Sequence, residues 1–199
     1  MVEFALILPV LLFLVLGMVE MGFAISNNTS IVTATRQGAR VGAELVNGSP
    51  TYSCSDSSGA ALVDDQIMLA VEGVLTSPGS LVTVAKVNSI DIFEVNGTTG
   101  APVVDSNNHA YENEWVPGTT TFTINSTQQI VDFALGTQPS GTAAWLASSR
   151  CGSAPAPGIG VRINYTYSFV TPLGSLIPAF GASLKMTDQT IMALEPPKS

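Results

Sequence analysis

An uncharged stretch near the amino terminus, FALILPVLLFLVLGMV at residues 4–19, decides the fold of this chain. A helix that is apolar on every side must be surrounded by lipid or by other helices of its kind. At about 1.5 Å per residue the stretch covers roughly 24 Å, a little short of the ~30 Å hydrocarbon core of a bilayer. Glu3 and Glu20 flank the stretch on its two sides. Extension of the spanning helix to Ile25 places the Glu20 carboxylate in the membrane, at a free-energy cost of about 2.5–3.5 kcal/mol. The stretch therefore predicts a membrane-spanning helix of marginal length.

The helical pattern continues well past this stretch. Small and apolar residues recur at helical spacing through residues 31–45, while Arg36, Arg40 and Glu44 fall on the opposite side. We expect one helix over residues 1–46, about 65–70 Å long, ended by the Asn-Gly-Ser-Pro sequence at 47–50. Pro9 removes one backbone hydrogen bond and predicts a bend or a locally melted turn at residues 5–9.

Composition bounds the function. The chain has 199 residues, so residues 47–199 are enough for one globular domain. Only 11% of the residues are charged, well below the ~25% of ordinary soluble domains, which predicts extensive contact with neighbours. The net charge of −8, without clustered Lys and Arg, argues against a nucleic-acid partner. The sequence contains none of the common nucleophile, phosphate-loop, dinucleotide or zinc-protease motifs, so we expect neither an enzyme nor a cofactor.

The remainder of the chain predicts an α+β head with a mainly antiparallel sheet and one packed helix. We expect that helix at about residues 59–75, packed on the sheet. Strands are expected at residues 81–87, 90–95, 119–124, 159–171 and 183–194, and residues 96–100 turn the second of them into a hairpin with 103–104. A polar loop is expected at 105–117, a short helix at 140–148 and a linker at 151–160.

Two parts of the sequence carry a family resemblance. MVEFALILPVLL at residues 1–12, with a second acid in GMVEMG at 17–22, resembles the TadE-like pilins and pseudopilins of the tight-adherence (Flp) type IV pili. The tail, VRINYTYSFVTP at 161–172 and LKMTDQTIMALE at 184–195, is similar to the two closing strands of that family. The resemblance implies a prepilin cut by a membrane aspartic peptidase, and contacts with the pilus assembly machinery. The first acid is usually fifth in the mature chain and is third here, which leaves open a different cut or two residues outside this numbering.

The resemblance also implies roles in assembly. It implies that Glu3 pairs with the terminal ammonium of a neighbouring subunit; the alternative is a first-turn acid that the helix dipole favours. Glu20 is either an interface marker or a second register contact. Gly17 and Gly22, and the G-x-x-x-G pair Gly38 and Gly42, permit close approach of helices, although plain small residues explain them equally well.

Three further sets of candidate residues lie in the head or, for two of the asparagines below, in the long helix. Cys54 and Cys151, the only cysteines, predict one disulfide, with free thiols as the alternative. Oxygen ligands in the loop that holds His109 make a weak Ca²⁺ candidate, for which a solvated loop is the simpler interpretation; they are Asp105, Asn107, Glu112 and Glu114. Six asparagines fit N-x-[ST], some of them by chance; they are Asn27, Asn28, Asn47, Asn96, Asn125 and Asn164.

Together these patterns predict a structural pilin subunit. Its helix anchors it in the membrane as a single span, and copies then pack helix to helix into an extracellular Tad/Flp-like filament that supports adhesion. Two alternatives stay open: a minor pseudopilin of the assembly machine, and a monomeric membrane-anchored module that binds an extracellular surface or sugar.

Overall fold

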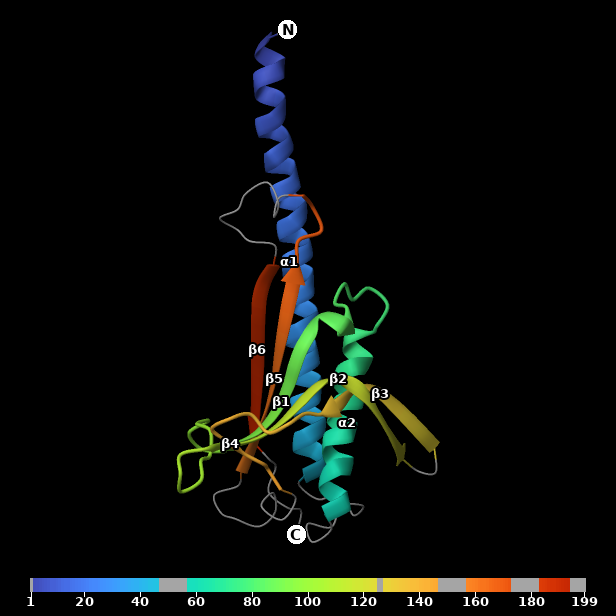
Figure 1. Cartoon of the computed structure of the whole chain (residues 1–199), viewed down its shortest axis with the longest axis vertical. Coiled ribbons are helices and arrows are strands. Elements are labelled where there is room, and N and C mark those ends of the chain that lie inside the picture. Colours follow the sequence, from blue (N-terminus) through green and yellow to red (C-terminus); the bar gives the residue numbers. More distant parts are fainter. Residues whose placement is uncertain (1, 47–56, 125–126, 147–156, 173–182, 194–199) are drawn as a thin grey trace.

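A computed structural model describes residues 2–46, 57–124, 127–146, 157–172 and 183–193. The first element is a single long helix, α1 (Val2–Val46). Its amino-terminal half projects beyond the rest of the molecule, and its carboxyl-terminal half lies in the head (Figure 1). The long helix expected from the sequence is therefore confirmed, while the division of the chain into domains at residue 46 stays a prediction.

Pro9 does not interrupt α1. The residues around it are helical without a break, so the expectation of a melted turn at residues 5–9 was wrong. The ring removes only the bond that would reach the carbonyl of Ala5. The helical bonds on either side continue the segment across this gap.

The head contains a sheet with the strand order β3-β2-β1-β5-β6. All four pairings along this path are antiparallel, while the short β4 pairs with β2 in parallel. The strands are β1 (Val87–Asn96), β2 (Ala110–Ile124), β3 (Thr127–Leu135), β4 (Thr142–Ala143), β5 (Pro157–Ser168) and β6 (Ser183–Ala193). The α+β class with a mainly antiparallel sheet is thus confirmed.

Two helices cover one face of this sheet. The lower half of α1 contacts β5 and β6, and α2 (Ser57–Leu75) lies beside α1 and reaches β3 (Figure 1). The core between the layers consists of alternate strand residues, such as Ile90 and Ile92 of β1, against helix residues such as Ile31 and Ala34. The helix expected at residues 59–75 is confirmed, but it packs on α1 as well as on the sheet.

Gly38 and Gly42 allow α1 to approach its neighbours closely. A Cβ atom at Gly42 would lie 2.5 Å from Cδ1 of Ile159 and 2.9 Å from Cδ1 of Ile67. At Gly38 it would lie 2.6 Å from Cγ2 of Val71. These two glycines therefore serve packing inside the head, between α1, α2 and β5.

Several local expectations differ from the structure. Residues 81–86 are not strand: Thr83 accepts a hydrogen bond from the Lys86 amide, and Val84–Lys86 is a 3-10 helix. The expected hairpin forms only in part. Val95 pairs with Pro102 in an isolated antiparallel bridge and the Val103 amide donates to the Glu94 carbonyl at 3.1 Å, but the principal partner of β1 on that side is β2. Within the expected loop at 105–117, β2 begins at Ala110. Residues 140–146 are not helical, because Gly141 has a positive φ of 85° and β4 follows it.

The remaining differences concern the second half of the head. The strands expected at 159–171 and 183–194 are confirmed as β5 and β6, with slightly different ends. β3 was not expected at all. Of the linker expected at 151–160, residues 151–156 lie outside the described residues and the rest begins β5.

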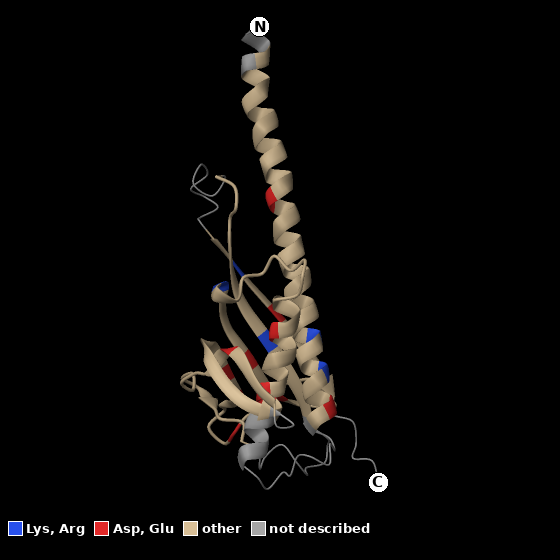
Figure 2. Ribbon diagram, turned by 90° about the vertical axis from the view of Figure 1, so that its right-hand side faces the viewer, with Lys and Arg blue, Asp and Glu red and all other residues tan. Residues whose placement is uncertain are grey.

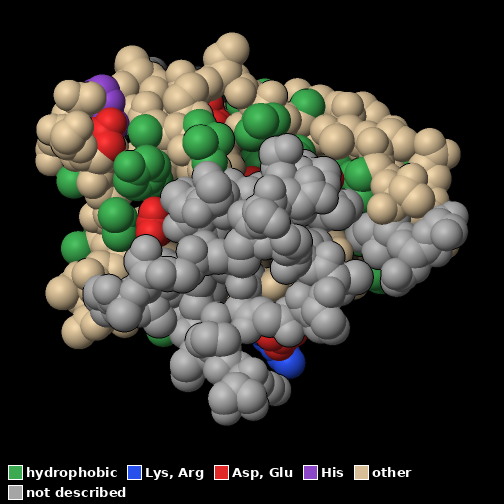
Figure 3. Space-filling view, turned by 90° about the horizontal axis from the view of Figure 1, so that it is seen from below, with side chains coloured by type: hydrophobic (Ala, Val, Ile, Leu, Met, Phe, Trp, Pro, Cys, Tyr) green, Lys and Arg blue, Asp and Glu red, His purple; other side chains and the backbone are tan. Residues whose placement is uncertain are grey.

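Seen from below, the described surface shows few charged groups and scattered hydrophobic ones (Figure 3).

Candidate functional site: the apolar stalk and the clamp at its base

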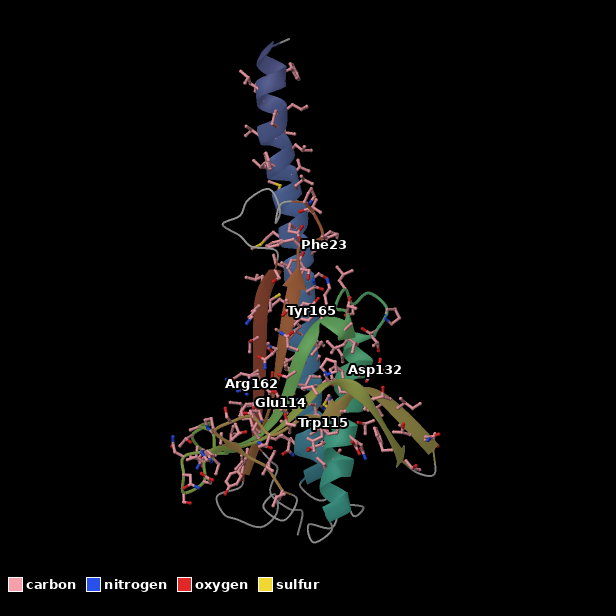
Figure 4. All side chains as sticks on the ribbon, viewed as in Figure 1. Phe23, Glu114, Trp115, Asp132, Arg162 and Tyr165 are labelled. Carbon is pink, nitrogen blue, oxygen red and sulfur yellow. The ribbon has the colours of Figure 1, made fainter. Side chains whose placement is uncertain are left out.

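The candidate site is the projecting part of α1, here called the stalk and defined as residues 4–19. Its large apolar side chains stand out on all sides of the helix (Figure 4). Phe4 is 80% exposed and Leu6 is 72% exposed. The other exposed members are Ile7, Leu8, Val10, Leu11, Leu12, Phe13, Leu14, Val15, Met18 and Val19. By length and composition, the segment Leu6–Leu45 that contains most of the stalk is able to cross a membrane.

Charge is almost absent from this part of the molecule. From residue 4 to residue 35 the sequence has one charged side chain, Glu20. Figure 2 shows one acidic position and no basic one along the projecting half of the helix. The side chain of Glu3 lies outside the described residues, so its pairing with a neighbouring subunit stays a prediction.

Glu20 sits at the base of the stalk and is held by the end of β5. The Tyr167 hydroxyl donates a hydrogen bond to Glu20 Oε1. The backbone amide of Val170 donates to the same oxygen at 3.0 Å, and the amide of Thr171 donates to Oε2 at 2.8 Å. Glu20 is only 5% exposed, so the head shields this carboxylate from solvent. We call this arrangement of Glu20, Tyr167, Val170 and Thr171 the Glu20 clamp.

The clamp provides hydrogen-bond partners both for the Glu20 carboxylate and for the groups of the head that bind it. A buried carboxylate is costly unless hydrogen-bond donors replace its water, and here three donors do so. Two of these donors are amides of the irregular chain after β5, which also need partners. The third is the Tyr167 hydroxyl, which must supply the proton of its bond because an ionised carboxylate can only accept. The clamp therefore fixes the point at which the stalk leaves the head.

Sequence reasoning found only part of this site. Glu20 was singled out because it ends the apolar run, but its partners lie 147 to 151 positions away in the chain. No local spacing connects such distant residues.

A Cβ atom added at Gly17 or at Gly22 would have no other atom within 4 Å, so neither glycine is used for packing within the described chain.

The face of the sheet opposite the helices carries a second polar cluster. Arg162 Nε lies 2.8 Å from Asp91 Oδ2, and Arg162 Nη2 lies 2.9 Å from Glu112 Oε1. The guanidinium also sits over the Phe93 ring, 5.4 Å from its centroid. Burial raises the pKa of Glu112, an effect that the Arg162 charge opposes. The cluster joins β1, β2 and β5 and has a structural role that accounts for its contacts.

The Ca²⁺ candidates do not converge. Asp105 Oδ1 accepts hydrogen bonds from the backbone amides of Asn107 and His109, both at 2.8 Å, and so closes its own turn. Glu112 is paired with Arg162 on β5. Within the described ranges, no three His, Cys, Asp or Glu side chains are grouped as metal ligands.

The asparagines of the N-x-[ST] sites differ in access. Asn27 is buried at 4% exposure, whereas Asn28 is exposed on α1. Asn96 Oδ1 accepts two backbone amides of its own turn, and Asn164 bonds to Ser89 and Asp91. Asn47 and Asn125 lie outside the described residues, as do Cys54 and Cys151.

The amino-terminal segment of the chain is similar to a known protein family. Residues 1–40 match the family model of TadE-like proteins. This segment contains the whole stalk, Glu20 and most of the part of α1 that lies in the head, up to residue 40 of a helix that ends at Val46. No curated protein and no solved structure matches the chain significantly. The resemblance seen in the sequence is confirmed for the amino-terminal segment.

Proposed function

We propose, from the premise that this TadE-like chain is associated with the Tad pilus machinery, that it is a structural pilin subunit. In this proposal the stalk anchors each copy in the membrane, and copies then assemble through their stalks into an extracellular filament that supports attachment. The role is structural rather than catalytic. Prepilin peptidase and the assembly machinery are the further partners that this function requires.

The exposed stalk is the observation that carries the proposal. Twelve of its large apolar side chains are exposed, from Phe4 to Val19. Removing them from water is worth on the order of 10–20 kcal/mol. That is comparable with the ~5–15 kcal/mol that holds a typical domain together, so the stalk requires an apolar environment. A bilayer supplies it before assembly, and neighbouring stalks supply it afterwards.

A filament also suits the shape of the chain. The stalk extends from one end of the head, so copies that pack their stalks together place their heads outside (Figure 1). Repeated head-to-tail contacts of this kind form an open helical array. Gly17 and Gly22, which contact nothing within the described chain, leave room for the close approach of a neighbouring helix.

The disulfide between Cys54 and Cys151 remains part of the proposal. Asn113 supports it, because its amide donates to Asp64 of α2 at 2.8 Å and its carbonyl accepts the Trp145 amide at 3.0 Å. Asp64 and Trp145 therefore lie close together, ten positions from Cys54 and six positions from Cys151 in the chain. Intact mass of the alkylated protein, with and without prior reduction, tests the bond.

Electron microscopy of material sheared from cells, with mass spectrometry of its main band, tests the function. We expect fibres built mainly from this chain, and no fibres from Glu3→Ala although that variant still reaches the membrane. Normal fibres from Glu3→Ala would show that Glu3 does not have the proposed pairing role. Fibres that contain this chain only in trace amounts would indicate a minor pseudopilin. A detergent-solubilised monomer from cells without fibres would indicate a membrane-anchored binding module.

A further inference from the structure

The exposed apolar surface does not stop at Glu20. On α1, Met21 is 62% exposed and Ile25 is 57% exposed. From the head, Val170 is 69% exposed immediately beside the clamp, and Leu184 at the start of β6 is 51% exposed. Phe169 is half-buried, and its ring lies edge-to-face against that of Tyr167 with a centroid distance of 5.8 Å. We call Met21, Ile25, Phe169, Val170 and Leu184 the collar.

The collar is continuous with the stalk and uncharged. Val170 is bonded through its amide to Glu20, and Leu184 is the register partner of Tyr167. The sequence from residue 168 to residue 184 has no charged side chain. The first charge beyond it is the exposed Lys185, one register position further along β6. In Figure 4, Phe23 lies at the level where the chain after β5 reaches α1, which marks the height of the collar.

The length of the apolar segment gives the collar a physical purpose. The stalk alone covers about 24 Å, which is too short for a ~30 Å hydrocarbon core. Helix residues 4–25 cover about 33 Å, which is sufficient. The obstacle to this longer span is the carboxylate of Glu20, which costs about 2.5–3.5 kcal/mol when it enters lipid without partners.

The Glu20 clamp removes this obstacle. Three donors from the head already replace the water that Glu20 would lose in the membrane. In return, Glu20 satisfies the amides of Val170 and Thr171, which irregular backbone in contact with lipid requires. Each side of the clamp thus makes the other compatible with an apolar environment.

We propose that the collar enters the outer boundary of the bilayer, so that the membrane-embedded surface consists of helix residues 4–25 together with Phe169, Val170 and Leu184 of the head. This inference rests on the membrane anchoring in the proposed function and extends it to a second segment of the chain. The exposed Lys185 then lies at the level of the lipid head groups.

Tryptophan fluorescence tests this placement. The full chain is reconstituted into phosphatidylcholine vesicles whose acyl chains carry bromine close to the head groups, and bromine quenches tryptophan that contacts it. The reporter is Val170→Trp; the native Trp115 and Trp145 are 4% and 1% exposed and give a constant background. Leu12→Trp reports the stalk. Ile130→Trp, at a position on β3 with 60% exposure, is the matched control on the head.

We expect quenching of at least about one third of the added signal in Val170→Trp, strong quenching in Leu12→Trp with bromine deeper in the chain, and none in Ile130→Trp. Quenching of Leu12→Trp without quenching of Val170→Trp would overturn the collar proposal and leave membrane anchoring intact. Absence of quenching in both would overturn the anchoring itself. A Val170→Trp signal that changes with protein density but not with bromine would assign the collar to contact between copies and overturn its placement in lipid.

Discussion

Tyr167→Phe is the sharpest test of the Glu20 clamp. It removes one hydroxyl and leaves the ring, which packs edge-to-face with Phe169 and is almost fully buried. After the change, the Glu20 carboxylate keeps only the amides of Val170 and Thr171 as donors. The perturbation therefore isolates a single hydrogen bond between β5 and α1.

A hydrogen bond to a charged group contributes about 1.5–3 kcal/mol to the free energy of unfolding. Removing the donor costs more of this stability when the charged partner stays buried. We expect Tyr167→Phe to lower the free energy of unfolding by about 2 kcal/mol. For a chain of this size that corresponds to a fall in Tm of about 4–8 °C. In a double-mutant cycle with Glu20→Ala, the unpaired amides occur in both arms and cancel, so we expect a coupling energy of about 1.5–2 kcal/mol.

The assay is thermal unfolding of the full chain in detergent, followed by near-ultraviolet circular dichroism of the buried Trp115 and Trp145. Tyr111→Phe is the matched control, because Tyr111 is half-buried on β2 and its hydroxyl makes no hydrogen bond with the described residues. If Tyr167→Phe behaves like Tyr111→Phe, or if the coupling energy falls below about 0.5 kcal/mol, the clamp does not hold the stalk to the head.

Three further substitutions, one of them a control, test the head and its packing. Burial, reinforced by Asp64, raises the pKa of Asp65 to about 6 from its ordinary value of 3.8. The folded state therefore favours the protonated form of Asp65, and the free energy of unfolding falls as the pH rises from about 4 through 6. We expect Asp65→Asn to abolish this fall, as measured by denaturant titrations at several pH values. At pH 7 the variant should be more stable than the parent by up to about 3 kcal/mol. Gly42→Val should lower the free energy of unfolding of the head by about 1–3 kcal/mol, because the new side chain overlaps its neighbours. Gly22→Val is the control and should leave the Tm of the detergent-solubilised chain within about 2 °C of the parent. Equal effects of the two glycine changes would contradict the packing described for α1.

The parts of the fold that could be predicted from the sequence are those whose signal is local. The length of α1 follows from its apolar run and helical spacing, and β5 and β6 follow from alternating apolar residues near the end of the chain. By contrast, Glu112 and Glu114 made the start of β2 resemble a loop. Glu112 is accommodated in a strand because Arg162, 50 positions away on β5, pairs with it. Such a charge pair becomes visible only when the strands are placed side by side.

Pro117 and Glu20 also have roles in the fold that their local sequence does not show. Pro117, the end of the loop expected at 105–117, lies within β2, where the register with β3 shifts between Pro117 and Thr120, and a proline is tolerated at such an irregularity. The role of Glu20 could not be read from the sequence because its donors come from the end of β5 and from the chain just after it. An acid at the end of an apolar run indicates an interface, but the groups that stabilise it depend on the tertiary fold.

The clamp and the helix glycines together divide α1 into two mechanical parts. From Glu20 onward the helix is fixed to the head, by the clamp at one end and by close packing at Gly38 and Gly42 toward the other. The stalk has no contact of this kind with the described part of the head, so any change in its curvature between the bilayer and a filament must arise within residues 4–19. Pro9 is the one position there without a backbone donor, and the bend should therefore be centred near it. In the proposed assembly, a stalk that adapts while the head stays fixed would allow one subunit to satisfy the membrane and the filament in succession.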